Sequence, residues 1–319
     1  MRRVARQTFL VLGALYQLAC SDPADQVGNL GSGGNPSSSG GNASTADGGN
    51  TSGGSGSGGA GSTDSSGGQN ASSGGAVGAG GSGSGGAPGS GGAGDSVFPE
   101  GVIQPKIMIV GDSISAGPGC YKGYLDQKLK DNGYSRYEFV GEYSDDCGKN
   151  VAHSAVSCTT SLDFTKPSFT LPDCKPGVEF PGMASLVAEH DPDLIMLQLG
   201  VNDVWGGSAP IQGILTNYST LLSQARAHNP QVVLVVAQIH KIITDNCTNA
   251  SSTTNAEALI QAVPDWAASQ STQQSPVFVA DLWTNSDPQE ADDCVHPDDA
   301  GAKRMGDNWY EALKGILPK

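Results

Sequence analysis

The stretch that decides the fold is IMIVGDSISAG, residues 107–117, in which an apolar run stops abruptly at Gly111, Asp112 and Ser113. Bulky aliphatic residues followed by glycine are typical of a buried strand that ends in a tight turn. A serine directly after such a turn is held where a substrate can reach its hydroxyl. Ser113 is therefore a candidate nucleophile, and the rest of the chain must supply a base, a residue that orients the base, and donors for an oxyanion.

From residue 106 onward, short apolar runs alternate with amphipathic segments, which is the pattern of a parallel sheet covered by helices. The predicted strands are residues 107–110, 138–140, 194–199, 232–239 and 277–280. The predicted helices are residues 121–130, 183–189, 211–227, 256–269 and 299–317. Ligands of such sheets bind outside the carboxyl ends of the strands, so polar residues at those ends are the candidates for a functional site.

The first twenty residues have the pattern of an export signal. Three arginines precede an apolar run from Phe9 to Ala19, which is short for a membrane span but suits a secretion signal. The next residues, Leu18-Ala19-Cys20, resemble the lipobox of bacterial lipoproteins, in which Cys20 would be lipidated and become the first residue of the mature chain. An ordinary signal peptide is the alternative. We therefore expect an extracytoplasmic protein, a cell-envelope lipoprotein or a secreted protein, that contacts the membrane only through an N-terminal lipid.

Residues 28–95 consist almost wholly of Gly, Ser, Ala, Asn and Thr, and they hold most of the 46 glycines. Such a composition cannot bury enough apolar surface to offset the entropy lost on ordering the chain. Residues 21–96 are therefore predicted to form a disordered tether, with a random-coil span of about 45 Å. Residues 97–319 are predicted to form one α/β domain.

Six cysteines remain when Cys20 is set aside, an even number that is typical of disulfides in an exported protein. Many pairings are possible, and sequence order favours Cys120–Cys147, Cys158–Cys174 and Cys247–Cys294. No C-x-x-C pair occurs, so the sequence predicts neither a metal site nor a cofactor. The formal net charge is −15, and it becomes −18 when the three leader arginines are subtracted. An acidic chain without a basic stripe is a poor candidate for binding nucleic acid.

Three polar clusters follow predicted strands: Ser113, then Gly200-Val201-Asn202-Asp203, then Asp293-Cys294-Val295-His296-Pro297. A serine hydroxyl becomes a good nucleophile when an imidazole accepts its proton, and a carboxylate sets the tautomer of that imidazole. Asp293 and His296 are three residues apart and can arrive together. Taken singly, each cluster is more often a turn or a helix cap. Their occurrence in this order, each beside a strand end, favours a catalytic site.

In these motifs the chain resembles the SGNH, or GDSL-type, serine hydrolases, whose blocks read Gly-Asp-Ser, Gly-x-Asn-Asp and Asp-x-x-His. The resemblance implies a three-layer α/β/α sandwich around a central, mostly parallel, flavodoxin-like sheet. It also implies that Ser113 is the nucleophile, His296 the base and Asp293 the partner of the base. The oxyanion hole would consist of the Ser113 backbone N–H, a backbone N–H of the second block, and the side chain of Asn202.

The second block, HSAVSCTT at residues 153–160, is where the chain departs from the family pattern, because Cys158 occupies the glycine position. A backbone N–H survives this replacement, so Cys158 is expected to complete the oxyanion hole. If the position requires a positive φ, a cysteine is strained there, and a disulfide from Cys158 would hold it. The alternative is that Cys158 is merely structural and that the alignment slips by one residue.

Within this superfamily the chain is most similar to the third family of carbohydrate esterases, which resemble acetylxylan esterases, over stretches that include 139–141, 193–197 and 293–305. This similarity implies removal of acetyl groups from a xylan-like polysaccharide through an acyl-Ser113 intermediate. Trp205 and Trp283 follow strand ends and can stack on sugar rings, and His153 is a further candidate for the cleft. The alternatives are a lysophospholipase or other lipid-ester esterase of the same fold, and a non-catalytic surface binding module.

Overall fold

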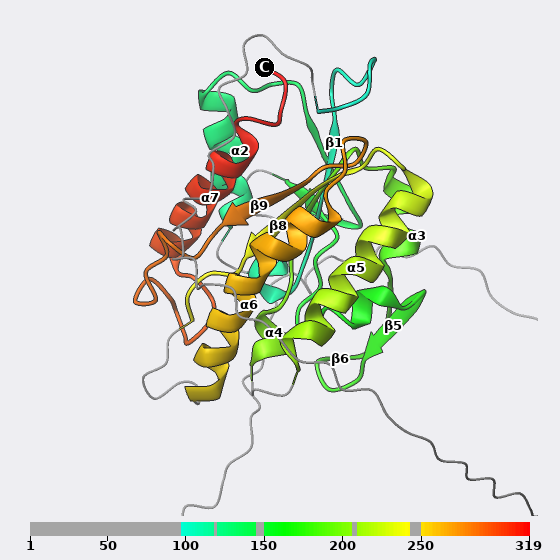
Figure 1. Ribbon diagram of the computed structural model, residues 1–319. Helices are drawn as coiled ribbons and strands as arrows, with labels where there is room; N and C mark the ends of the chain where they lie inside the picture. The colour runs from blue at the N-terminus through cyan, green and yellow to red at the C-terminus, as the bar shows by residue number, and fades with distance from the viewer. Residues whose placement is uncertain (1–96, 118–119, 145–149, 206–208, 243–249) are drawn as a thin grey trace, which may run out of the picture. The chain divides into compact units, whose positions relative to one another are not determined.

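The computed structural model describes residues 97–117, 120–144, 150–205, 209–242 and 250–319 (Figure 1). The predicted signal peptide, the predicted tether and Cys20 lie outside the described residues. None of the described helices is both long and apolar enough to cross a lipid bilayer.

Five strands form the central sheet, and every pairing in it is parallel. Their spatial order is β2-β1-β7-β8-β9. Their bounds are Lys106–Gly111 for β1, Glu138–Val140 for β2, Leu194–Gln198 for β7, Val233–Gln238 for β8 and Val277–Asp281 for β9. Because the chain passes to opposite sides of β1, the order reverses between β1 and β7. At such a reversal the loops after the two strands diverge and leave room for a ligand.

Helices cover both faces of this sheet, so the predicted three-layer α/β/α sandwich is confirmed (Figure 1). Two helices, α2 and α7, lie side by side on one face, and α3, α5 and α6 lie on the other. The bounds are Tyr121–Asp131 for α2, Met183–His190 for α3, Ile211–His228 for α5, Ala250–Gln270 for α6 and Asp299–Leu313 for α7. The last helix ends four residues before the predicted residue 317, where Lys314 caps it and Gly315 follows.

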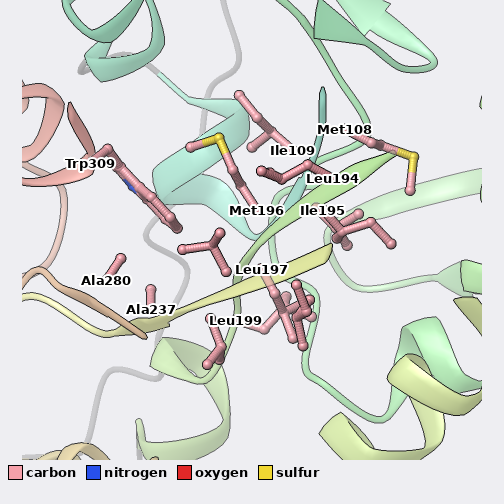
Figure 2. Close-up of a cluster of buried hydrophobic side chains, with 14 of the residues drawn as sticks. Met108, Ile109, Leu194, Ile195, Met196, Leu197, Leu199, Ala237, Ala280 and Trp309 are labelled. Atoms are coloured by element: carbon pink, nitrogen blue, oxygen red, sulfur yellow. The ribbon is translucent and has the colours of Figure 1, made fainter. Parts of the chain in front are cut away.

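The core lies between the sheet and its two helical layers. Figure 2 shows aliphatic side chains of β1 and β7, among them Ile109 and Met196, with the indole of Trp309 from α7 beside them. All three side chains are fully buried. Every residue of β7 is buried, because helices pack on both faces of the sheet. This explains why the parallel strands are continuous apolar runs in the sequence rather than alternating ones.

Two short antiparallel hairpins were not predicted. One pairs β3, Tyr143–Ser144, with β4, Ala152–His153, and the other pairs β5, Ser168–Leu171, with β6, Lys175–Pro181. The second hairpin includes prolines at both ends of β6, which suit a short hairpin outside the main sheet but obscure the strand pattern. Three single-turn helices complete the described elements: α1 at Ser113–Ala116, η1 at Asp163–Thr165 and α4 at Val201–Val204.

The close packing of α2 on α7 depends on Gly306. A Cβ atom at this position would lie 2.9 Å from the Cβ of Tyr124 and 3.0 Å from the backbone N of Leu125. We therefore expect Gly306→Ala to lower the free energy of unfolding by about 1–3 kcal/mol, measured by urea denaturation. The matched control is Gly213→Ala in α5, where the nearest atom to a new Cβ is 4.0 Å away. That substitution should raise stability by up to about 1 kcal/mol, and equal effects of the two would contradict the packing argument.

Candidate active site

Ser113 begins α1 directly after β1 ends, at the carboxyl edge of the sheet where β1 and β7 part. The turn requires Gly111, because a Cβ there would lie 2.9 Å from the carbonyl oxygen of Gln198 on β7. Asp112 caps α1: its Oδ1 accepts the backbone N–H of Ile114 at 3.0 Å. Complete burial raises the pKa of Asp112 to about 7, and no hydrogen bond reaches its Oδ2 within the described chain.

The Ser113 hydroxyl is hydrogen-bonded to His296, although the two residues are 183 positions apart. The distance from Ser113 Oγ to His296 Nε2 is 2.9 Å. The other ring nitrogen, Nδ1, lies 2.7 Å from Oδ2 of Asp293. Since the carboxylate accepts hydrogen bonds, Nδ1 carries the proton and Nε2 is left to accept one from the serine. The structure thus brings the three predicted residues into one hydrogen-bonded chain.

The loop before α7 holds Asp293 in its ionised form. Its Oδ1 accepts the backbone N–H groups of both Val295 and His296 at 2.7 Å. Partial burial by itself would raise the pKa of Asp293, but these hydrogen bonds and the one from the His296 ring together hold the pKa below its usual value. The carboxylate therefore stays charged and can stabilise a positive imidazole.

The second block runs beside the end of β1. The N–H of Ser154 donates to Ile109 at 2.8 Å, and the N–H of Val156 donates to Gly111 at 3.0 Å. Further along, Cys158 has a φ of +67° and forms a disulfide with Cys174. The left-handed conformation is the one expected at a glycine position of the family pattern. Within the described residues, no group accepts a hydrogen bond from the Cys158 N–H, so that donor is available.

Asn202 presents a second donor to the same region. It lies in α4, which starts at Gly200, where φ is +115° and a Cβ would lie 2.8 Å from the hydroxyl of Tyr218. One N–H of the Asn202 amide donates to the carbonyl oxygen of Thr159 at 2.8 Å. This bond joins Asn202 to the residue after Cys158, and it leaves the second amide N–H for another acceptor.

Asp203 was not assigned a role from the sequence, yet it holds the two blocks together. This buried carboxylate accepts the N–H of Ser161 at 2.9 Å and the hydroxyl of Ser161 at 2.6 Å. The amide of Asn217 in α5 donates to the same hydroxyl at 2.9 Å. Burial raises the pKa of Asp203, and the hydrogen bonds from Ser161 oppose that rise. Its position directly after Asn202 was the available sequence signal.

The three candidate substrate contacts have different environments. Trp205 and Trp283 are half-buried and keep part of the indole exposed. The ammonium of Lys241 lies 5.8 Å from the centre of the Trp283 ring. His153, in contrast, is only 4% exposed, and its Nδ1 accepts the N–H of Ala155 at 3.2 Å. Burial lowers the pKa of His153 to about 3, so its ring is neutral, and its contact with a substrate stays a prediction.

A second buried histidine, His240, hydrogen-bonds to the loop that carries His296. His240, 5% exposed, lies after β8, and its Nε2 donates to the carbonyl oxygen of Val295 at 2.8 Å. Burial lowers the pKa of His240 to about 4, so the ring is neutral near pH 7. A small cavity of about 20 Å³ lies against His240 and Val295, and its lining includes neither Ser113 nor His296.

One group among the described residues has the donor atoms of a metal site. The ligand atoms of Glu142, Glu189 and His190 lie within 4.8 Å of one another. His190 Nε2 is already 3.1 Å from a carboxylate oxygen of Glu142. This group takes no part in the hydrogen-bonded chain of Ser113.

Two more cysteines, Cys120 and Cys294, are disulfide-bonded as well. Their predicted partners, Cys147 and Cys247, lie outside the described residues, so those two pairings stay predictions. Cys294 sits between Asp293 and Val295, in the loop that carries the base.

Comparisons with known proteins agree with this geometry. The sequence model of the GDSL-like lipase/acylhydrolase family matches residues 109–304. The chain is 27% identical over 219 residues to Esterase TesA of Pseudomonas aeruginosa, covering 66% of this chain and 89% of that protein. It is 26% identical over 226 residues to a multidomain esterase of Ruminococcus flavefaciens, covering 66% of this chain but only 29% of that longer protein.

Among solved structures, a carbohydrate esterase family 3 protein from Talaromyces cellulolyticus superposes with a TM-score of 0.57 at 25% identity. The match covers 67% of this chain and 98% of that one.

The burial of His153 predicts a pH dependence of stability. Its pKa is about 3 in the folded chain against 6.5 when exposed, so its contribution is complete above pH 6.5 and is lost as the pH falls. Relative to His153→Phe, the wild type should lose roughly 1–2 kcal/mol of unfolding free energy between pH 6.5 and pH 5, with a slope that approaches about 1.4 kcal/mol per pH unit at the lower end. Urea denaturation of both proteins at several pH values measures this difference, and parallel pH profiles would contradict the burial of a neutral imidazole.

Proposed function

Because the chain belongs to the GDSL-like lipase/acylhydrolase family, we propose that it is a serine esterase that works through an acyl-Ser113 intermediate. The observation that carries the proposal is the continuous set of hydrogen bonds from Ser113 Oγ through His296 to Asp293. Such a set activates a hydroxyl that is otherwise a weak nucleophile. A binding module would have no need for it.

In the first half of the reaction, Ser113 Oγ attacks the ester carbonyl carbon while His296 Nε2 takes the hydroxyl proton. Asp293 stays ionised and stabilises the imidazolium that results. When the tetrahedral intermediate collapses, His296 gives the proton to the departing alcohol oxygen and the ester C–O bond breaks. In the second half, water repeats the attack on the acyl group, which leaves as the free acid and restores the Ser113 hydroxyl.

The negative charge that develops on the carbonyl oxygen is held by three donors: the N–H groups of Ser113 and Cys158 and the free amide N–H of Asn202. A hydrogen bond to Thr159 restrains Asn202 and a disulfide restrains Cys158, so little free energy would be spent on reorienting these two donors. The beginning of α1 adds little by itself, since it is only one turn long.

Two substitutions test the chemistry. Ser113→Ala should lower kcat/KM for p-nitrophenyl acetate by about 10⁴-fold or more, because the hydroxyl that forms the acyl intermediate is lost. Asn202→Ala should lower kcat by roughly 10²–10³-fold with a smaller change in KM, because the lost donor acts mainly on the oxyanion. Equal rates for wild type and Ser113→Ala would contradict the proposal and leave the binding module as the better account.

We propose acetyl groups on a polysaccharide as the substrate. The proposal is supported by the likeness to the carbohydrate esterase family 3 structure and by the two partly exposed indoles of Trp205 and Trp283, which can stack on sugar rings. The second candidate is a lipid ester such as a lysophospholipid. It is favoured by Leu162, a 53% exposed apolar side chain four residues after Cys158, which offers apolar surface to an acyl chain.

The product that the enzyme releases, acetate or fatty acid, distinguishes the polysaccharide substrate from the lipid substrate. Purified protein should release acetate from acetylated xylan, and it should hydrolyse p-nitrophenyl acetate faster than esters with long acyl chains. Release of fatty acid from lysophospholipid without release of acetate from xylan would overturn the proposed substrate. The Ser113→Ala variant is the control for both assays.

We also propose that the enzyme is exported and anchored outside the cytoplasm through a lipid on Cys20. The support is the leader pattern of residues 1–20, the Gly/Ser-rich residues 28–95 that follow it, and the disulfide-bonded cysteines of the folded part. Mass spectrometry of the mature N-terminus should find diacylated or triacylated Cys20. An unmodified N-terminus at another residue would contradict the anchor.

A further inference from the structure

The backbone at Cys158 has a conformation that its side chain disfavours. Its φ of +67° lies in the left-handed region, where any Cβ is crowded against the backbone. Only three other non-glycine residues in the described chain share a positive φ, at positions 120, 150 and 191. Something must therefore hold Cys158 in place, because a free cysteine would gain stability by leaving this conformation.

Hydrogen bonds hold the neighbours of Cys158 but not Cys158 itself. Thr159 is tied through its carbonyl to Asn202 and through its hydroxyl to Val156, at 2.8 and 2.7 Å. Ser161 is tied to Asp203. Within the described chain, Cys158 has its disulfide as the only restraint of its own beyond the covalent backbone.

The other end of this disulfide is well anchored. Cys174 lies in the turn between β5 and β6, where its N–H donates to Leu171 at 3.1 Å. Buried Phe169 and Phe180 stack across the two strands with ring centres 5.6 Å apart. Phe169 also meets Phe164 of η1 edge-on at 5.1 Å. A rigid hairpin is thus attached to the one residue of the second block that lacks a hydrogen-bonded restraint.

We propose that Cys174 is a positioning residue: through its disulfide, it holds the backbone N–H of Cys158 toward the oxyanion. The proposal rests on the proposed esterase function and extends it to the β5–β6 hairpin. In the family pattern a glycine adopts the left-handed conformation at this position without steric strain. Here the disulfide to the β5–β6 hairpin would maintain the same conformation at a cysteine. The alternative is that the disulfide only stabilises the fold.

A matched pair of double variants separates the two accounts without leaving a free thiol. The first double variant, Cys158→Ala with Cys174→Ala, removes the disulfide and keeps a Cβ at position 158; it is called the alanine pair. The second, Cys158→Gly with Cys174→Ala, removes the disulfide and also the Cβ; it is called the glycine pair. Both lose the same cross-link, so any difference between them reports on the backbone conformation at position 158.

On p-nitrophenyl acetate, kcat of the alanine pair should fall about fivefold or more below that of wild type, and the glycine pair should recover most of this loss, with KM changed much less, because the N–H acts on the transition state. The Tm of the glycine pair should also be higher, by about 2 °C or more. Equal kcat values for the two pairs, or failure of both to fold, would overturn the proposal. The Cys158–Cys174 disulfide would then only stabilise the fold.

The test distinguishes this proposal from the esterase function itself. If wild type and Ser113→Ala are equally inert or equally active, the esterase proposal fails, while the difference in Tm between the two pairs still reports whether the disulfide restrains position 158. Equal Tm values then overturn the restraint as well. If wild type is active and the two pairs have equal kcat, only the role of Cys174 fails.

Discussion

The proposed activity depends on one contact, the 2.9 Å hydrogen bond between Ser113 Oγ and His296 Nε2. Its two residues come from opposite ends of the folded part of the chain, and the parallel sheet is what brings them together. Ser113 follows β1, the second strand in the spatial order, and His296 follows β9 at one edge. Because all five strands run in the same direction, their following loops emerge at the same edge. We expect that insertion or deletion of one residue in the turn after β1 would move the Ser113 hydroxyl away from the His296 imidazole.

Buried polar groups support this contact from several sides. Asp293 orients the imidazole, His240 holds the backbone of Val295, and Asp203 holds Ser161 of the second block. Each of these three side chains makes at least one hydrogen bond, as buried polar groups generally do, although Nδ1 of His240 and Oδ2 of Asp112 have no partner within the described chain. The site is thus organised before a substrate binds, and an enzyme of this kind gains rate from donors that need no reorganisation.

Much of the fold and the central three residues could be predicted, because their signals are local or depend on strand direction alone. Apolar runs such as residues 194–198 mark the parallel strands, and polar residues at their ends must share one edge of the sheet. The hairpins could not be predicted, since the strands are very short or interrupted by proline and glycine. The burial of His153 depends on tertiary packing of one such hairpin, and the position of Asp203 depends on Ser161, 42 residues away. Neither leaves a periodic signal in the sequence.

The most direct measurement of the central claim is covalent labelling of the protein with an alkyl phosphonofluoridate, followed by peptide mass spectrometry. We predict one adduct per molecule, on the peptide that contains Ser113, and labelling at least about 100-fold slower in His296→Ala because the hydroxyl loses its base. A label on any other residue, or equal rates of labelling in wild type and His296→Ala, would contradict an activated serine at this edge of the sheet.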